Sequence, residues 1–414
     1  MSPVSRRSFL KLSGAASAAL AGANLCSSQR LAAAGPRIAA ATEPHHSKSA
    51  AGSPKERPDL LDANSAKGLE VLQLTTDPEV PGSHVYMEAQ IFTPDSKRLV
   101  LHRSAHAHGS DPQDPRHQYL LCDLERGCAL QPLTDEPGAT GPSVSPDGRW
   151  LYYFVNETRV GGGKLTLKRV RLEGSGRETI VVVDSPLAGT VFRPSRIYPL
   201  STISSDGRRI AISAFLGDGR KESGPFGLLV FEIDKATVRL VLQGPTLCNL
   251  HPQYCRSLKP EEAHDILVQE NHGNITDAQG SITRLTGGAG ADIHVVRDDG
   301  GNLRDLPWGR DGNEYCQGHQ CWRGRSTWAI TSTSSREPPE ARLIESRAVP
   351  HTGHDGLKMP RGIRNHLSGA FPDPHFYHFA TDLSGGRLIT DAAPLDKGGR
   401  LFVAELGEPG KEPA

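Results

Sequence analysis

The chain has 414 residues, and its 47 basic and 47 acidic side chains give a formal net charge of zero. A nucleic-acid partner would require a strongly basic face, so the balanced charge argues against one. Glycine (44) and proline (31) are plentiful and methionine is scarce (3), a mixture typical of many short strands joined by turns.

The N-terminal segment predicts export. Arg6 and Arg7 precede Phe9-Leu10-Lys11, which is the pattern of a twin-arginine signal. The weakly apolar run that follows is about 14 residues long, too short to cross a bilayer as a helix. We therefore expect residues 1–38 to be a signal peptide and the mature protein to be periplasmic or secreted, with no transmembrane span.

Composition also sets the expected domain boundaries. Residues 39–67 contain Ala, Pro, Ser, Lys and Glu with few large apolar groups, so we expect a disordered linker there. Residues 68–408 are expected to form the folded domain, and residues 409–414 a flexible tail.

Six of the seven cysteines lie beyond the predicted signal and fall in close pairs, Cys122/Cys128, Cys248/Cys255 and Cys316/Cys321. None has Cys-x-x-Cys spacing, so a structural zinc site is not expected. The first pair flanks a turn-like stretch and could face across a hairpin. An exported protein can form such a disulfide, and buried thiols are the equal alternative.

One short pattern recurs along the chain. An apolar or aromatic residue is followed by a Pro/Ser-Asp-Gly-type turn, a basic residue and an alternating apolar strand. Copies begin at Phe92, Val144, Ile203, Cys255, Trp322 and Phe379. They start about 50 to 65 residues apart, a period that indicates a propeller or solenoid. The Asp-Gly turn between strands predicts a hairpin, because glycine tolerates positive φ.

A second strand pair follows several copies, most clearly in residues 119–134 and 228–242. Four strands per repeat make one propeller blade. The sequence therefore predicts an all-β fold, a β-propeller of seven four-stranded antiparallel blades. Strands at Leu69–Leu74 and Arg400–Leu406 are expected to complete one blade from both termini and so close the ring. A sandwich assembled from similar hairpins is the alternative.

Histidines are frequent in the second half, and three of them precede hairpin repeats: His251, His319 and His378. The strand at that place in a propeller is the innermost one, so equivalent positions converge near the axis. Three imidazoles together with Gln or Asp side chains would suit a divalent metal ion. The alternative is three separate histidines, each satisfied by backbone hydrogen bonds.

These segments resemble the oligogalacturonate lyase family, seven-bladed propellers that cleave short pectin fragments. The likeness rests on His251-Pro-Gln253, on Gln269-Glu-Asn-His272-Gly, on Gly-His319-Gln-x-Trp322, and on a histidine just before the last Phe-x-x-Asp turn. The motifs that carry the likeness lie within residues 251–382. The earlier blades share only the general pattern of repeated turns and strands.

The resemblance implies a metal-assisted β-elimination, with manganese as the metal. His251 takes the place of the base that removes the C5 proton next to the uronate carboxylate, and His272 is the second candidate for that role. Arg256 matches an arginine that pairs with the substrate carboxylate, a task that its planar guanidinium suits. His319 and His378 match two metal ligands.

The chain departs from the family in its last ligand cluster, where one histidine is missing from its slot. We expect Asp373 and His375 to complete the metal shell there. Gln253, Gln320 and Arg323 are expected to bind substrate.

A longer stretch at residues 273–313 is expected to remodel the cleft, so the substrate is either oligogalacturonate or another uronate-containing oligosaccharide. The alternative functions are a non-catalytic propeller that binds a saccharide or a protein, and an accessory propeller of a hydrolase.

Overall fold

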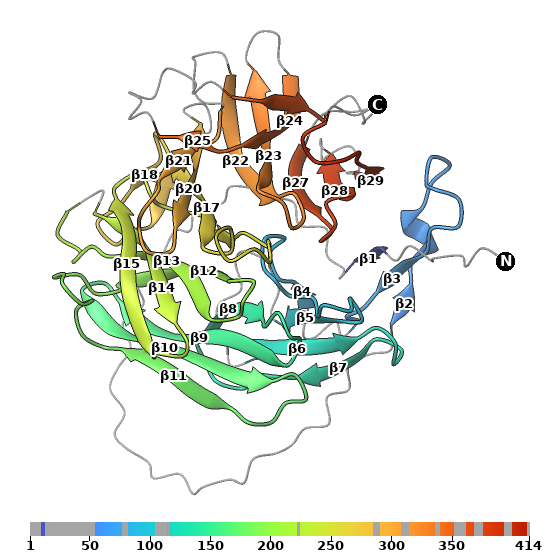
Figure 1. Cartoon of the computed structure of the whole chain (residues 1–414). Helices are drawn as coiled ribbons and strands as arrows, with labels where there is room; N and C mark the ends of the chain where they lie inside the picture. The colour runs from blue at the N-terminus through green and yellow to red at the C-terminus, as the bar shows by residue number, and fades with distance from the viewer. Residues whose placement is uncertain are drawn as a thin grey trace, which may run out of the picture.

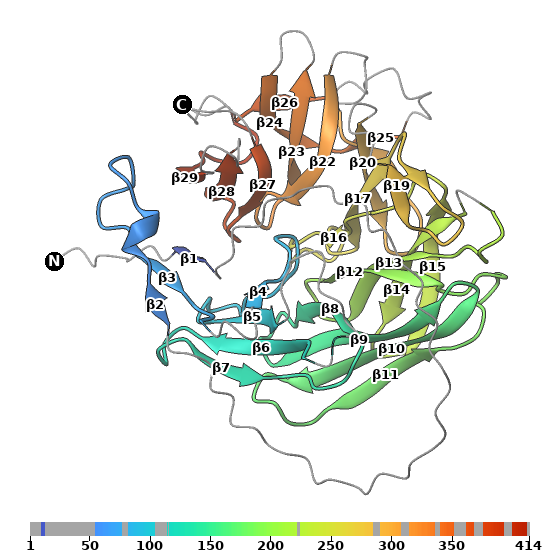
Figure 2. The same cartoon turned by 180° about the vertical axis from the view of Figure 1, so that it is seen from behind.

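The computed structural model describes residues 54–76, 82–103, 114, 116–221, 224–284, 290–307, 314–335, 340–351, 362–367, 376–392 and 400–411, together with the backbone of Leu10–Leu12. Within these ranges the regular structure is β-strand, apart from one 3-10 turn, η1 (Pro58–Leu60). The sheets stand side by side around a ring (Figures 1 and 2). The predicted all-β propeller is confirmed.

The first three blades are four-stranded sheets in simple up-and-down order. The first contains β4 (Gly82–His84), β5 (Arg98–Arg103), β6 (Gln118–Asp123) and β7 (Ala129–Pro132). The second contains β8 (Ala139–Val144), β9 (Trp150–Arg159), β10 (Gly162–Arg171) and β11 (Glu178–Val183). The third contains β12 (Arg196–Ile203), β13 (Arg209–Phe215), β14 (Phe226–Glu232) and β15 (Thr237–Gly244).

The next two blades share hydrogen bonds, because β20 pairs with β22 at Ala291 and Cys316. Blade four contains β16 (Gln253–Tyr254), β17 (Asp265–Asn271), β20 (Ala291–Arg297) and β21 (Arg304–Asp305). Blade five contains β22 (Glu314–Trp322), β23 (Trp328–Ser335), β24 (Glu340–Arg347) and β26 (Arg364–His366). The short strand β25 (Val349–Pro350) returns to pair with β21. A small hairpin, β18 (Ile275–Thr276) and β19 (Ile282–Arg284), projects from blade four.

The ends of the chain differ from the sequence prediction. Blade six contains β27 (Phe376–Thr381), β28 (Arg387–Ala392) and β29 (Arg400–Glu405). The C-terminal strand β29 is thus the third strand of blade six, because it pairs with β28 along its whole length. No described sheet combines strands from both termini.

A small N-terminal sheet occupies the seventh position, between blade six and blade one (Figure 1). It contains β1 (Leu10–Leu12), β2 (Lys55–Glu56) and β3 (Val71–Gln73), in the order β1-β3-β2. Residues 54–67 therefore belong to the folded part and are not all linker, since pairing with β3 satisfies the backbone of β2. At the other end Gly410 N donates to Glu345, so the chain is packed beyond residue 408.

The repeated turns are built by short side chains that bond to the backbone. Ser145 Oγ donates to Asp147, and Asp147 Oδ1 accepts from the backbone N–H of Arg149. Gly148 follows with φ of 68°, a conformation that side chains disfavour. The same arrangement recurs at Ser204 and Asp206. The local sequence alone therefore specifies these hairpins.

The hydrophobic core lies in layers between neighbouring blades. One layer contains residues of blades two and three, including Phe154, Leu167, Ile212 and Phe231. Further layers join each consecutive pair of blades, and another packs Leu74 of the N-terminal segment on blade one. Most sheets are covered on both faces, which explains why their strands read as almost continuous apolar runs.

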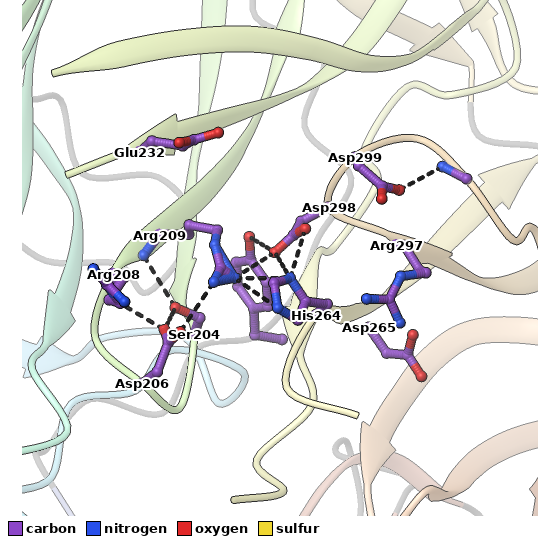
Figure 3. A network of polar contacts seen from close by, with 12 residues as sticks. Ser204, Asp206, Arg208, Arg209, Glu232, His264, Asp265, Arg297, Asp298 and Asp299 are labelled. Atoms are coloured by element: carbon purple, nitrogen blue, oxygen red, sulfur yellow. Dashed lines mark hydrogen bonds and ion pairs between the residues drawn. The ribbon is translucent and has the colours of Figure 1, made fainter. Parts of the chain in front are cut away.

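A buried ion-pair network joins blades three and four at the end of the ring that carries the repeated turns (Figure 3). Arg209 Nη1 lies 3.0 Å from Asp298 Oδ2, and His264 Nδ1 lies 3.0 Å from Asp298 Oδ1. The Tyr254 hydroxyl also donates to Asp298. One carboxylate thus holds groups from both blades.

We expect Asp298→Ala to destabilise the fold by roughly 3 kcal/mol, because Arg209, His264 and Tyr254 all lose a buried partner and only Arg209 keeps another carboxylate, Asp206. Chemical unfolding measures this loss. The matched control is Asp234→Ala, which breaks an exposed pair of 2.8 Å with Arg208 and should cost less than about 1 kcal/mol. Equal losses in the two variants would contradict the bridging role of Asp298.

The six cysteines of the predicted mature chain are buried thiols. Cys122 and Cys128 lie close together, since Cys122 Sγ is 3.7 Å from the carbonyl oxygen of Cys128, but no disulfide joins them. Of the two possibilities left open by the sequence, the structure shows the buried thiols. Burial raises the pKa of both Cys255 and Cys321 to about 12.

These thiols should react slowly with iodoacetamide in the folded protein at mildly alkaline pH, because the nucleophile is the thiolate and burial suppresses it. After unfolding in denaturant, labelling should be fast at all six positions. Mass spectrometry of the alkylated peptides measures both rates. Rapid labelling of Cys255 or Cys321 in the folded protein would show that these side chains are accessible.

No helix in the described ranges is long and apolar enough to span a membrane.

Candidate functional site

The three histidines singled out in the sequence occupy equivalent places in their blades. In blades four, five and six, the inner hairpin is closed by a hydrogen bond from the backbone N–H of Cys255, Arg323 and Asp382, respectively. His251, His319 and His378 each lie four residues before that position. At this place the ladder is irregular. The register shifts between Cys316 and Gln320 on β22, and between Phe376 and Phe379 on β27.

Such bulges redirect side chains away from the regular pleat. His319 and His378 both lie within these irregular segments. His251 precedes β16 and has a positive φ of 46°, which is uncommon for a residue with a side chain. Irregular backbone therefore carries all three imidazoles at the inner edge of the ring.

Two of the three imidazoles pack on one tyrosine of blade one, and the third packs on one of these two imidazoles. The ring centroids of His319 and His378 lie 4.9 Å apart. The Tyr86 ring lies 5.5 Å from the His251 ring and 5.7 Å from the His378 ring. The predicted convergence of blades four, five and six is thus observed, and blade one joins them.

A buried carboxylate of blade one contacts His251. Glu88 Oε2 lies 2.7 Å from His251 Nδ1, although 163 residues separate the two positions. Both side chains are nearly inaccessible, with exposures of 3% and 5%. Burial raises the pKa of Glu88, and the nearby His251 partly opposes this effect. The carboxylate fixes one ring nitrogen and directs the other, Nε2, away from itself.

His378 is oriented in the same way by a carboxylate of its own blade. Its Nδ1 lies 2.8 Å from Asp391 Oδ2, and its backbone N–H donates to Asp391 Oδ1 at 2.7 Å. This contact leaves Nε2 as the nitrogen that His378 can offer to a ligand. A carboxylate behind a histidine is the usual arrangement at metal sites, where it fixes the ring and raises its basicity.

Two of the expected substrate-binding residues instead hold the backbone around His251. Gln253 Nε2 donates to the carbonyl oxygen of Gln320 at 2.7 Å, and Gln320 Nε2 donates to that of His251 at 3.3 Å. Trp322 Nε1 donates to the carbonyl oxygen of Gln253. Gln253 and Gln320 are buried, so their amides position blade four against blade five.

The two arginines also make contacts between chain segments. Arg323 is 1% exposed, and its guanidinium contacts Glu345 at 2.5 Å and the carbonyl oxygens of Gly385 and Gly407. This corrects its expected substrate role, since no face of the side chain remains for a sugar. Arg256 is half-buried and donates to the carbonyl oxygen of Thr381. Its expected pairing with a substrate carboxylate stays a prediction.

The remaining candidates lie elsewhere. His272 Nε2 is 2.8 Å from Asp292 Oδ2, and with Glu270 these residues form a group at one end of the paired strands β17 and β20 of blade four. Asp373 and His375 lie outside the described residues, so their role as metal ligands stays a prediction.

The sequence analysis missed Tyr86, Glu88 and Asp391. Glu88 lies five residues before Thr93, which begins the first turn, and so occupies nearly the same place in its repeat as His251. Asp391 is an acidic residue next to the buried Thr390 on β28. An acidic residue at a place in the repeat where the strand is expected to be buried is unusual unless the residue is paired. This feature of the sequence could have identified both positions.

The donor set suits a divalent metal ion. His319 and His378 supply imidazoles from adjacent blades, and the Glu88 and Asp391 carboxylates supply negative charge beside them. Glu88 Oε1 is buried and makes no hydrogen bond of normal geometry within the described part of the chain. An oxygen buried in this way is costly unless a cation or a donor approaches it.

No protein-family model matches the chain, and no curated protein matches it. Among solved structures, an oligogalacturonate lyase in complex with manganese has a TM-score of 0.59 and 17% identity, covering 83% of this chain and 80% of that one. An oligogalacturonate lyase from Vibrio parahaemolyticus has a TM-score of 0.58 and 17% identity, covering 85% of this chain and 82% of that one. The chain shares the propeller fold of these oligogalacturonate lyases, as the resemblance in its motifs predicted.

Proposed function

We propose that this protein is a metal-dependent lyase that cleaves oligogalacturonate, or another uronate-containing oligosaccharide, by β-elimination. The observation that carries the proposal is the convergence of His251, His319 and His378 at one end of the ring. Each of them is placed by an irregular backbone segment. The fold shared with oligogalacturonate lyases supports the same reaction class.

His319 and His378 would hold the ion, with Asp373 and His375 as the expected additional ligands. Manganese is the proposed metal, as in the solved lyase complex. A bound divalent ion would polarise the uronate carboxylate and so make the adjacent C5 proton more acidic. Asp391 keeps the His378 ring in the orientation that such binding requires.

His251 is the proposed base. Its Nδ1–H donates to Glu88, which leaves the lone pair on Nε2 available to accept the C5 proton. The buried carboxylate then stabilises the imidazolium that forms, so Glu88 acts as a positioning residue. The electron pair of the broken C5–H bond forms the C4–C5 double bond. The C4–O4 bond breaks with its electron pair remaining on O4, which takes a proton from water as the saccharide leaves.

The hairpin β18–β19 would affect which saccharide is bound. Arg196 Nη1 donates to Ser281 Oγ at 2.5 Å, and the Tyr198 hydroxyl donates to the carbonyl oxygen of Gly280. Both contacts fasten the hairpin to the start of β12, the innermost strand of blade three. The start of β12 is the end of that strand opposite the Ser204–Asp206 turn, so the hairpin covers this end of blade three. We also propose that the protein is exported by the twin-arginine route. Because this route carries proteins that have already folded, the metal could be bound before export.

The purified protein should produce an unsaturated uronide when incubated with Mn²⁺ and a panel of uronate oligosaccharides. The new double bond is conjugated with the carboxylate, so near-ultraviolet absorbance follows the reaction. Treatment with a chelator should abolish the activity and added Mn²⁺ should restore it. Absence of absorbance with every uronide, together with absence of bound metal by elemental analysis, would favour a non-catalytic binding propeller.

Three variants should separate the roles of the residues. His251→Ala should lower kcat by roughly 10²–10⁴-fold, the usual contribution of a general base, while the bound metal is retained. His319→Ala should lose the metal and with it the activity. Glu88→Gln preserves the side-chain shape, so it should lower kcat with little change in KM.

An exposed histidine outside this site provides the matched control. His366→Ala, on β26, should retain both activity and metal. Full activity of His251→Ala would transfer the role of base to another residue, of which His272 is the first to examine.

A further inference from the structure

A second group of ionisable side chains lies on the outer strands of blade four. His294 is on β20, Asp305 is on β21, and His351 directly follows β25. Nδ1 of His294 and Nδ1 of His351 each lie 2.8 Å from Asp305 Oδ1. One potential ligand atom from each residue lies within 4.8 Å of the other two.

We propose that His294, Asp305 and His351 form a second metal site, separate from the central one, for an ion of the zinc type. Two imidazoles with one carboxylate are a donor set that suits zinc and similar borderline ions better than calcium or magnesium, which prefer oxygen ligands. The proposal does not depend on the lyase activity.

The first supporting observation is an oxygen atom without a partner. Asp305 is 1% exposed, and its Oδ2 makes no hydrogen bond within the described part of the chain. A buried carboxylate oxygen that lacks a partner loses its hydration without compensation. A cation at this place would supply the missing interaction.

The second observation is the support behind His294. Its Nε2 lies 3.1 Å from Glu270 Oε2, and Glu270 Oε1 accepts a hydrogen bond of 2.5 Å from Thr246. The chain Thr246–Glu270–His294 therefore fixes the ring and presents Nδ1 towards Asp305. Histidine ligands of metals are commonly held by a carboxylate on the other ring nitrogen in this way.

An ion would replace the two hydrogen bonds to Asp305 and move the donor atoms slightly apart. The nitrogen–oxygen distances are 2.8 Å, whereas two ligands of a tetrahedral ion with bonds of about 2.0–2.1 Å are about 3.3 Å apart. The His294 and Asp305 side chains are buried, but that of His351 is 37% exposed, so the group is open to solvent on the His351 side.

Such an ion would fasten two parts of the ring. β25 follows blade five in the chain and pairs with β21 of blade four, where Asp305 is opposite Val349. The backbone pairing there covers only two residue pairs. Metal ligation by His351 would therefore strengthen a short connection between the blades.

The test uses the full folded chain, depleted of metal with a chelator and then titrated with Zn²⁺ and with Co²⁺. Elemental analysis after desalting should find one more equivalent of Zn²⁺ in the wild type than in His351→Ala. Co²⁺ should give visible absorption bands typical of nitrogen–oxygen ligation, and Zn²⁺ should raise the Tm by several degrees. His351→Ala should lose these responses, whereas the control His366→Ala should keep them.

His319→Ala distinguishes this site from the central one. It should retain the Zn²⁺ equivalent that depends on His351 even if it loses another. Equal Zn²⁺ content and an equal rise in Tm for the wild type and His351→Ala would overturn the proposal and leave an ion-pair network in its place. A failure of the lyase assay would have no bearing on this result.

Discussion

The packing of each sheet against its neighbours is the constraint on which the rest of the structure depends. Consecutive blades bury a shared layer of Leu, Ile, Val and Phe side chains, and these layers set the angle between one sheet and the next. A ring results, in which the innermost strands run in parallel directions around a common axis. Residues at equivalent places in different repeats therefore meet at one end of that axis, although dozens of residues separate them in the chain.

The two ends of the ring differ in their side chains: one carries the stabilising turns, and the other carries the three central histidines. At one end, the repeated turns are stabilised locally by Ser and Asp side chains, and Asp298 joins neighbouring blades through Arg209 and His264. At the other end, the strands begin with irregular backbone that redirects His251, His319 and His378. A regular strand would alternate these side chains between the two faces of its sheet, where the apolar layers lie. The bulges therefore allow polar groups to accumulate without disturbing the core between the blades.

Carboxylates behind histidines recur throughout this end of the molecule. Glu88 contacts His251, Asp391 contacts His378, and Glu270 contacts His294. In each pair one ring nitrogen is engaged, so the orientation of the other nitrogen is defined. The partners come from different distances along the chain. Asp391 and Glu270 each lie on the adjacent strand of the same blade as their histidine, whereas Glu88 belongs to a different blade from His251. The central site thus depends both on a contact within one blade, His378–Asp391, and on a contact between distant blades, His251–Glu88.

The sequence by itself determined the hairpins, since the Ser-Pro-Asp-Gly turns and the alternating strands are local features, and it determined the repeat and hence the propeller. It also identified the three central histidines, because their place within the repeat is a local property. Only the tertiary structure decided which partners they have: Glu88 reaches His251 across 163 residues, and no local pattern specifies such a pair. Tertiary packing likewise buried Arg323 against Glu345. It also placed β29 in blade six and β3 in the small N-terminal sheet with β1 and β2. Contacts between distant segments depend on which surfaces meet when the ring forms, and this information is absent from any single segment.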